Sequence, residues 1–161
     1  MLRLRVHRLL HRAKRQLFPL DAEAKRLGWK INVSAKMRRL RGQVFGIIGL
    51  GRIGRLVAAM AKPFDMTVIA YDPYLTAQQG AARGARLVAL EDLLRQSDFI
   101  SMHCPMTAET KGMINAERLQ LVKPGAFFVN AARGGIVDGA ALQAAIQRGQ
   151  VRGAALDVFP K

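Results

Sequence analysis

The feature that most constrains the fold is the stretch FGIIGLGRIG at residues 45–54, where an apolar run breaks into three glycines. The spacing is G-x-G-x-x-G, with a strand-like run before it and a helix-like segment after it, as a dinucleotide-binding turn requires. Gly49 would allow the tight turn, Gly51 would leave room for a pyrophosphate, and Gly54 would let the helix pack closely on the strand. The stretch therefore predicts the start of a βαβ unit that binds a dinucleotide.

Three residues near this turn indicate how the ligand would be held. The N–H groups of Arg52 and Ile53 come at the positive end of the following helix, where we expect them to face the phosphates. Asp72 lies 18 residues after Gly54, where an acid accepts hydrogen bonds from the adenosine ribose. A carboxylate there also repels the extra phosphate of NADP, so the sequence predicts NAD. The alternative for Asp72 is a turn residue before Pro73.

From residue 43 onward, short apolar runs alternate with segments of helical periodicity. Such an alternation of near-continuous apolar strands with helices indicates a parallel sheet covered on both faces. The expected fold class is therefore α/β, a doubly wound parallel sheet of the Rossmann type. Strands are expected at 43–48, 66–71, 86–88, 98–103, 126–130 and 151–159, and helices at 53–64, 75–84 (a helix or a turn), 90–96, 115–122 and 138–149.

The positive charge is concentrated at the start of the chain. Of the formal net charge of +15 over 161 residues, +11 falls in residues 1–41. We expect a basic helical segment at 1–41 and a dinucleotide-binding domain at 42–161. The basic segment could be a solvated helix, a contact to a phosphate backbone, a membrane-surface helix or an organelle transit peptide, and these alternatives stay open.

Composition excludes several other classes of protein. Half of the residues are hydrophobic, which argues against a disordered chain, and no apolar run reaches the ~18 residues of a membrane span. The single cysteine, Cys104, cannot form a disulfide within the chain, which fits a reducing compartment such as the cytoplasm. We expect neither a metal site nor a membrane partner.

Five motifs, GIIGLGRIG, YDPY, HCPMTAET, VNAARGGIVD and GAALDVF, follow one another along the chain. In this order and spacing they resemble the NAD-binding domain of the D-isomer-specific 2-hydroxyacid dehydrogenases. That family includes D-3-phosphoglycerate dehydrogenase and the C-terminal-binding-protein corepressors, and YDPYL and GAALDVF lean toward the corepressor-like branch. The resemblance covers about residues 30–161. It implies an NAD-dependent oxidoreductase acting on CH–OH donors, with a small 2-hydroxy or 2-oxo acid as substrate.

The resemblance also implies roles for residues beyond the glycine turn. Cofactor contacts are implied for Cys104 and Pro105 after the fourth strand, for Thr110 toward the phosphates, for the backbone of Ala131 and Ala132 near the nicotinamide, and for Asp157 at the nicotinamide carboxamide. His103 does not match the family's catalytic histidine. Because neighbouring residues on a strand point to opposite faces, we also do not expect His103 to pair with Cys104.

The one catalytic residue that the resemblance implies is Arg133, which would clamp the substrate carboxylate and polarise the 2-oxo group. A guanidinium presents a fork of donors and keeps its charge, so it suits both tasks. The alternative is an arginine on a glycine-rich loop that pairs with a nearby acid such as Asp138.

In the family, a glutamate and a proton-donating histidine follow the last motif, whereas this sequence ends at Lys161. We therefore expect a chain truncated at its C-terminal end, lacking most of the substrate domain, that binds NAD but turns over little alone. Exposed interfaces predict self-association or a homo-oligomer.

Two other functions compete with this interpretation. The first is a stand-alone dinucleotide-sensing interaction module of the corepressor type, whose residues 1–41 would contact nucleic acid or an acidic partner. No DNA-binding motif is present, so we do not expect a nucleic-acid partner. The second is an NAD enzyme of another reaction class, which would make the NAARGG motif coincidental.

Overall fold

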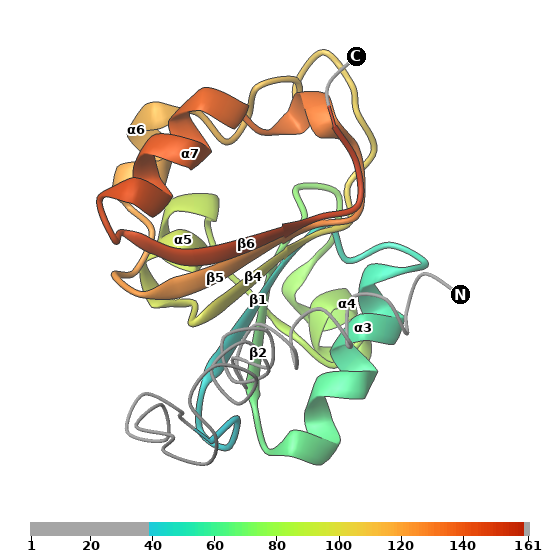
Figure 1. Ribbon diagram of the computed structural model, residues 1–161. Helices are drawn as coiled ribbons and strands as arrows, with labels where there is room; N and C mark the ends of the chain where they lie inside the picture. The colour runs from blue at the N-terminus through green and yellow to red at the C-terminus, as the bar shows by residue number, and fades with distance from the viewer. Residues whose placement is uncertain (1–38, 160–161) are drawn as a thin grey trace.

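The computed structural model describes residues 39–159, and nearly all of the basic segment expected at 1–41 lies outside them. Within these residues, one sheet has the strand order β3-β2-β1-β4-β5-β6, and every neighbouring pair is parallel (Figure 1). The strands are β1 Val44–Ile48, β2 Thr67–Tyr71, β3 Arg86–Leu87, β4 Phe99–Met102, β5 Ala126–Asn130 and β6 Val151–Leu156. The doubly wound parallel sheet predicted from the sequence is confirmed.

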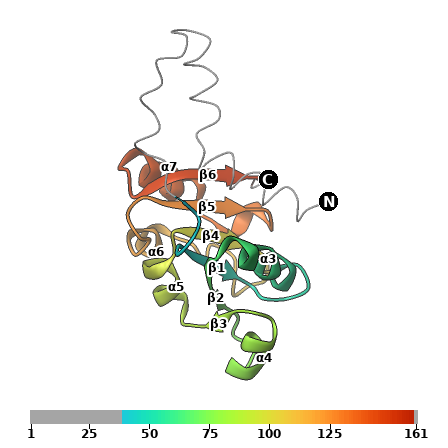
Figure 2. The same ribbon diagram turned by 90° about the horizontal axis from the view of Figure 1, so that it is seen from below.

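Helices cover the two faces of this sheet (Figures 1 and 2). On one face lie α3 Gly54–Ala61 and α4 Ala77–Ala82; on the other lie α5 Leu90–Gln96, α6 Ala116–Gln120 and α7 Gly139–Gln147. Each face has its own buried core, one built around α3 and the other around α5, α6 and α7. Because both faces are covered, the central strands β1 and β4 are almost entirely buried, which is why they are continuously apolar.

Besides shifts of one or two residues at other element ends, three local features differ from the sequence prediction. The helix expected to reach residue 64 ends as α3 at Ala61 and continues as a 3₁₀ turn at Lys62–Phe64, because Pro63 has no N–H to continue the α-helical bonds. β6 ends at Leu156 rather than at residue 159, since its partner β5 ends opposite it. A 3₁₀ turn at Gly134–Ile136 was not predicted.

The sheet topology determines where a ligand can bind. From β1 the chain winds outward to β2 and β3, then returns to β4 on the other side of β1 and winds outward to β5 and β6. The carboxyl ends of these parallel strands meet at one edge, and the reversal between β1 and β4 opens a crevice there, where α/β sheets bind ligands. Among the described residues, no helix is long and apolar enough to cross a bilayer.

Candidate functional site

The loop after β1 contains three glycines, and the surroundings of a Cβ atom differ from one position to the next. Gly49 has φ 90°, and a Cβ on it would come within 2.6 Å of the Cys104 backbone nitrogen. A Cβ on Gly54 would overlap the carbonyl oxygen of Gly49. Around Gly51, in contrast, no atom lies within 4 Å of a Cβ position. The fold itself therefore requires glycine at two of these positions, whereas the space at Gly51 is open to a ligand.

The start of α3 offers backbone donors to that space. Ile53 is the N-cap residue, and its side chain makes no capping hydrogen bond. Within residues 39–159, the N–H groups of Arg52 and Ile53 also have no backbone acceptor. Free N–H groups at the positive end of a helix attract phosphate oxygens, so this end of α3 fits a dinucleotide pyrophosphate.

Asp72, at the carboxyl end of β2, has two sets of contacts. Its Oδ2 accepts a hydrogen bond from the Leu50 N–H at 2.9 Å, and its Oδ1 accepts one from the Tyr74 N–H at 3.1 Å. The second bond makes Asp72 a turn residue, as the alternative interpretation proposed. The first bond joins the carboxylate to the glycine loop. The Asp72 side chain therefore has two roles: it stabilises its own turn, and it holds the glycine loop.

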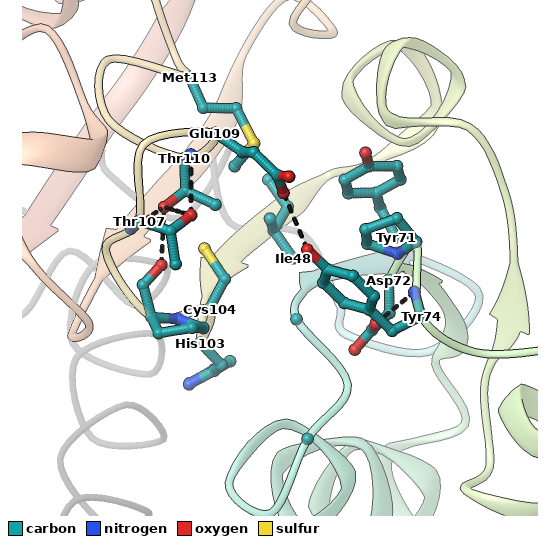
Figure 3. Close-up of a pocket in the computed structure, with 14 residues that line it drawn as sticks. Ile48, Tyr71, Asp72, Tyr74, His103, Cys104, Thr107, Glu109, Thr110 and Met113 are labelled. Atoms are coloured by element: carbon teal, nitrogen blue, oxygen red, sulfur yellow. Dashed lines mark hydrogen bonds between the residues drawn. The ribbon is translucent and has the colours of Figure 1, made fainter.

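A pocket lies at the carboxyl ends of β1, β2 and β4 (Figure 3). It is lined by seven of the residues singled out from the sequence, namely Gly49, Gly51, Asp72, His103, Cys104, Pro105 and Thr110. Across it, the Tyr74 hydroxyl donates to Glu109 Oε2 at 2.8 Å, although Tyr74 is 78% exposed. This hydrogen bond to the Glu109 carboxylate raises the pKa of Tyr74.

The loop after β4 is held by its own threonines. The Thr110 hydroxyl donates to the Pro105 carbonyl at 2.7 Å and accepts from the Thr107 N–H at 2.8 Å. Its one hydroxyl proton is therefore used within the loop. Thr110 lies in the pocket wall, but in this conformation its hydroxyl donates to the Pro105 carbonyl rather than into the pocket.

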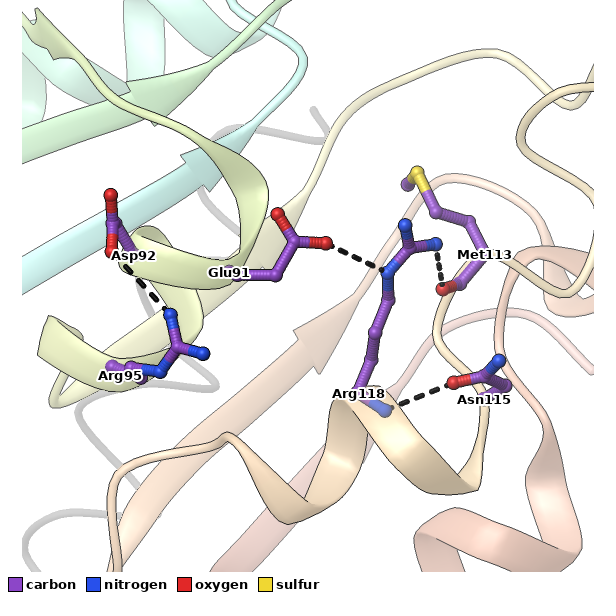
Figure 4. Close-up of polar contacts among 6 residues, drawn as sticks. All are labelled: Glu91, Asp92, Arg95, Met113, Asn115 and Arg118. Carbon is purple, nitrogen blue, oxygen red and sulfur yellow. Dashed lines mark hydrogen bonds and ion pairs between the residues drawn. The ribbon is translucent and has the colours of Figure 1, made fainter.

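Arg118 supports the same loop from outside (Figure 4). Its Nη1 donates to the Met113 carbonyl at 2.9 Å and its Nε to Glu91 Oε1 at 3.3 Å. Asn115 caps α6 by accepting from the Arg118 N–H at 3.0 Å. Because Met113 lines the pocket, these contacts tie the pocket wall to α5 and α6. The sequence analysis did not single out Arg118, since its partners lie on other elements.

His103 and Cys104 do not form a catalytic pair. His103 Nε2 lies 2.9 Å from the hydroxyl of the buried Ser101, two residues earlier on the same face. Burial lowers the pKa of His103 from 6.5 to about 4, so the ring is neutral at physiological pH. Burial also raises the pKa of the Cys104 thiol. Among residues 39–159, no three His, Cys, Asp or Glu side chains gather as a metal site.

The loop after β5, which carries Arg133, is ordered by Asn130, a residue that the sequence analysis did not single out. Asn130 is 1% exposed; its Oδ1 accepts from the Ala132 N–H at 3.0 Å and its Nδ2 donates to the Arg133 carbonyl at 2.9 Å. Its own carbonyl accepts from the Asp157 N–H at 2.9 Å. The buried amide thus orders the loop after β5, and the backbone carbonyl of the same residue joins this loop to the end of β6, where Ala131 is also buried.

The Arg133 side chain is exposed at this end of the sheet. Its Nη1 donates to the Ala132 carbonyl at 2.8 Å. Asp138 instead caps α7 by accepting from the Ala141 N–H, and among the described residues no ion pair joins it to Arg133. The alternative of an Arg133–Asp138 pair is therefore not observed.

The candidate residues follow the strand order along the edge. Asp72 follows β2 and Arg133 follows β5, and these two strands are three strand spacings apart, about 14 Å. The pocket includes the β1, β2 and β4 part of this row. The other candidates, which do not line it, are Arg52, Ile53, Gly54, Ala131, Ala132, Arg133 and Asp157. The arrangement fits an extended dinucleotide laid across the edge from β2 toward β5.

Comparison with known proteins agrees with this geometry. Residues 7–161 match the family described as D-isomer specific 2-hydroxyacid dehydrogenase, NAD binding domain. D-3-phosphoglycerate dehydrogenase of Mycobacterium tuberculosis (strain ATCC 25618 / H37Rv) is 48% identical over 151 residues, which are 94% of this chain and 28% of that protein. The D-3-phosphoglycerate dehydrogenase of Bacillus subtilis (strain 168) is 44% identical, over 80% of this chain and 26% of its own length.

A solved structure is also similar to this chain. D-lactate dehydrogenase from Aquifex aeolicus, complexed with NAD and lactic acid, has a TM-score of 0.92 and 36% identity, covering 99% of this chain and 48% of that one. The chain spans about a quarter of the length of the two curated relatives. Both are phosphoglycerate dehydrogenases, so they do not support the lean toward the corepressor-like branch.

Proposed function

The chain belongs to the D-isomer-specific 2-hydroxyacid dehydrogenase family through its NAD-binding domain, and we propose that it serves an enzyme that interconverts a 2-hydroxy acid and a 2-oxo acid. NAD, when bound, supplies the acceptor or donor of the hydride. The chain's own residues bind the two ends of the cofactor and orient the substrate. The observation that carries this proposal is the open glycine loop at the uncapped start of α3, with Asp72 beside it.

Each candidate residue has a task in this proposal. The N–H groups of Arg52 and Ile53 bind the pyrophosphate, and the free lone pairs of Asp72 accept from the adenosine ribose. At the other end, backbone groups of Ala131 and Ala132 and the side chain of Asp157 face the nicotinamide. Cys104, Pro105 and Thr110 form the wall between these ends.

Arg133 is the proposed substrate residue. Its exposed guanidinium can turn from the Ala132 carbonyl to a carboxylate and a neighbouring 2-oxo group without losing its charge. Among the described residues no histidine accompanies it as a proton donor, because the single histidine of that range, His103, is neutral and bonded to Ser101. We therefore expect the chain to bind NADH with little turnover, since loss of a general acid costs about 10²–10⁴-fold.

A fluorescence titration of the purified chain with NADH and NADPH tests the proposal. We expect saturable NADH binding, weaker NADPH binding, and loss of NADH affinity in an Asp72→Ala variant. Asp72→Asn keeps an acceptor for the Leu50 N–H but removes the charge, so it should narrow the preference for NADH over NADPH. A folded chain that binds neither nucleotide would refute the proposal.

We also propose a cytoplasmic location and a homo-oligomeric state for the protein. The first is supported by the single cysteine, Cys104, which suits a reducing compartment. The second is supported by large apolar side chains that are exposed near the end of β6, among them Phe159 at 72%.

A further inference from the structure

Leu50, between the first two glycines of the loop, is held from two sides. Its side chain is fully buried. Its N–H donates to Asp72 Oδ2 at 2.9 Å, and its carbonyl accepts from Arg83 Nη1 at 2.8 Å. The carboxylate comes from the end of β2 and the guanidinium from the end of α4. Two separate elements therefore fix both backbone polar groups of one residue in the glycine loop.

Arg83 reaches the loop from a well-anchored helix end. It is the C-cap residue of α4, and its N–H donates to the carbonyls of Gln79 at 3.1 Å and Gly80 at 3.0 Å. The helix begins with a reciprocal capping box between Thr76 and Gln79. At its other side it lies so close to β3 that a Cβ on Gly80 would come within 2.5 Å of the Leu87 side chain. The backbone of Arg83 is thus held in place, and its partly buried guanidinium extends from a fixed position.

The Arg83 bond determines the orientation of the next peptide N–H. No cis peptide occurs in the described residues, and in a trans peptide the carbonyl and the N–H point in opposite directions. With the Leu50 carbonyl held toward Arg83, the N–H of Gly51 is held away from it. No backbone acceptor among residues 39–159 takes that N–H, and the space around Gly51 is open.

We propose that Arg83 is a positioning residue for the cofactor, acting through the Leu50 peptide to hold the glycine loop in its binding conformation. Without this bond the Leu50–Gly51 peptide would be free to rotate, and the loop would have to become ordered when the pyrophosphate binds. Such ordering lowers affinity, whereas a loop that is already ordered does not incur this cost. The inference rests on the proposed binding of NAD.

The first test is an NADH titration of four versions of the 161-residue chain: the wild type, Arg83→Met, Arg83→Lys and Arg86→Met. Arg86 is exposed, three residues away on β3, and bonded to Gln96, so its variant removes the same charge from the same region. We expect Arg83→Met to weaken NADH binding about five- to tenfold, Arg83→Lys to recover most of it, and Arg86→Met to have no effect. Equal losses at both arginines, or none at Arg83, would overturn the proposal.

The second test needs no cofactor and separates this proposal from the proposed function. Amide hydrogen exchange of the ligand-free chain should show faster exchange of the Leu50 N–H in Arg83→Met than in the wild type, with the amides of β1 and β4 unchanged. Unchanged exchange at Leu50 would refute the positioning role even if NADH binds well. If the wild type does not bind NADH, the proposed function fails, and with it the part of this proposal that concerns the cofactor.

Discussion

At the scale of single residues, His103 should make the stability of the chain depend on pH. In the folded chain its pKa is about 4, below the ordinary 6.5 of the unfolded chain. Between pH 4 and pH 6.5, His103 is therefore protonated in the unfolded chain but neutral in the folded chain. Stability is therefore complete above pH 6.5 and falls as the pH drops toward 4, by about 1–3 kcal/mol. Denaturant midpoints measured from pH 4 to 7 should show this slope. A His103→Gln variant that keeps the whole slope would contradict the assignment.

The thiol of Cys104 should react slowly. Burial raises its pKa, so little thiolate is present at neutral pH, and the chain has no other cysteine to confuse the signal. We expect iodoacetamide to alkylate the folded chain at least about tenfold more slowly than the urea-unfolded chain at pH 7.5. Because Cys104 lines the pocket, NADH should slow the reaction further. An NADH-independent rate would place the cofactor elsewhere.

At the scale of elements, the glycine loop allows binding and stability to be separated. Gly51→Ala places a methyl group in open space, so the free energy of unfolding should change by less than about 0.5 kcal/mol. NADH affinity should nevertheless fall, since the methyl group occupies the space of the pyrophosphate. Gly54→Ala forces α3 away from the Gly49 carbonyl and should destabilise the chain by about 2 kcal/mol.

Chemical denaturation and NADH titration of the two variants check this prediction. A Gly51→Ala variant that binds NADH like the wild type would show that the loop is not the pyrophosphate site. A Gly54→Ala variant of full stability would show that the close approach of α3 to β1 is not needed.

The loop after β5 gives a second prediction at this scale. Asn130→Ala removes a buried amide and leaves the Ala132 N–H and the Arg133 carbonyl without their partners. The expected cost is about 1–3 kcal/mol of unfolding free energy. Asn130→Asp keeps an acceptor for Ala132 but buries a carboxylate against the Arg133 carbonyl, so it should lower the unfolding temperature at least as much as Asn130→Ala. Equal stability of all three chains would contradict this role.

Elements and side-chain networks differ in how far the sequence predicts them. The strand β5 and the helix α5 were predicted at their observed bounds, because each has a local apolar pattern and a clear turn before or after it. The bonds of Arg83 to Leu50 and of Arg118 to Glu91 join residues 33 and 27 positions apart. Which side chains meet across such distances depends on how the helices pack on the sheet, and no local pattern records it.

At the scale of the whole molecule, the two edges of the sheet differ. The β3 edge is two residues long, whereas β6 is six residues long and is followed by the exposed Phe159. A short edge strand presents few unpaired N–H and C=O groups to another sheet, whereas a longer edge strand presents more of them and pairs more readily. We expect the 161-residue chain to self-associate through the β6 side, so that its sedimentation coefficient rises with concentration. A Phe159→Glu variant should reduce that rise, and a concentration-independent monomer would contradict the prediction.

The bond from α4 to the glycine loop has a consequence in the opposite direction. Coupling between two parts of a protein is reciprocal: if an ordered α4 strengthens cofactor binding, a bound cofactor must stabilise α4 by the same free energy. This short helix lies beside β3 at the margin of the sheet, where local unfolding is ordinarily easiest. A bound cofactor would thus slow the local unfolding of α4, the helix that carries Arg83, although α4 lies outside the cofactor site.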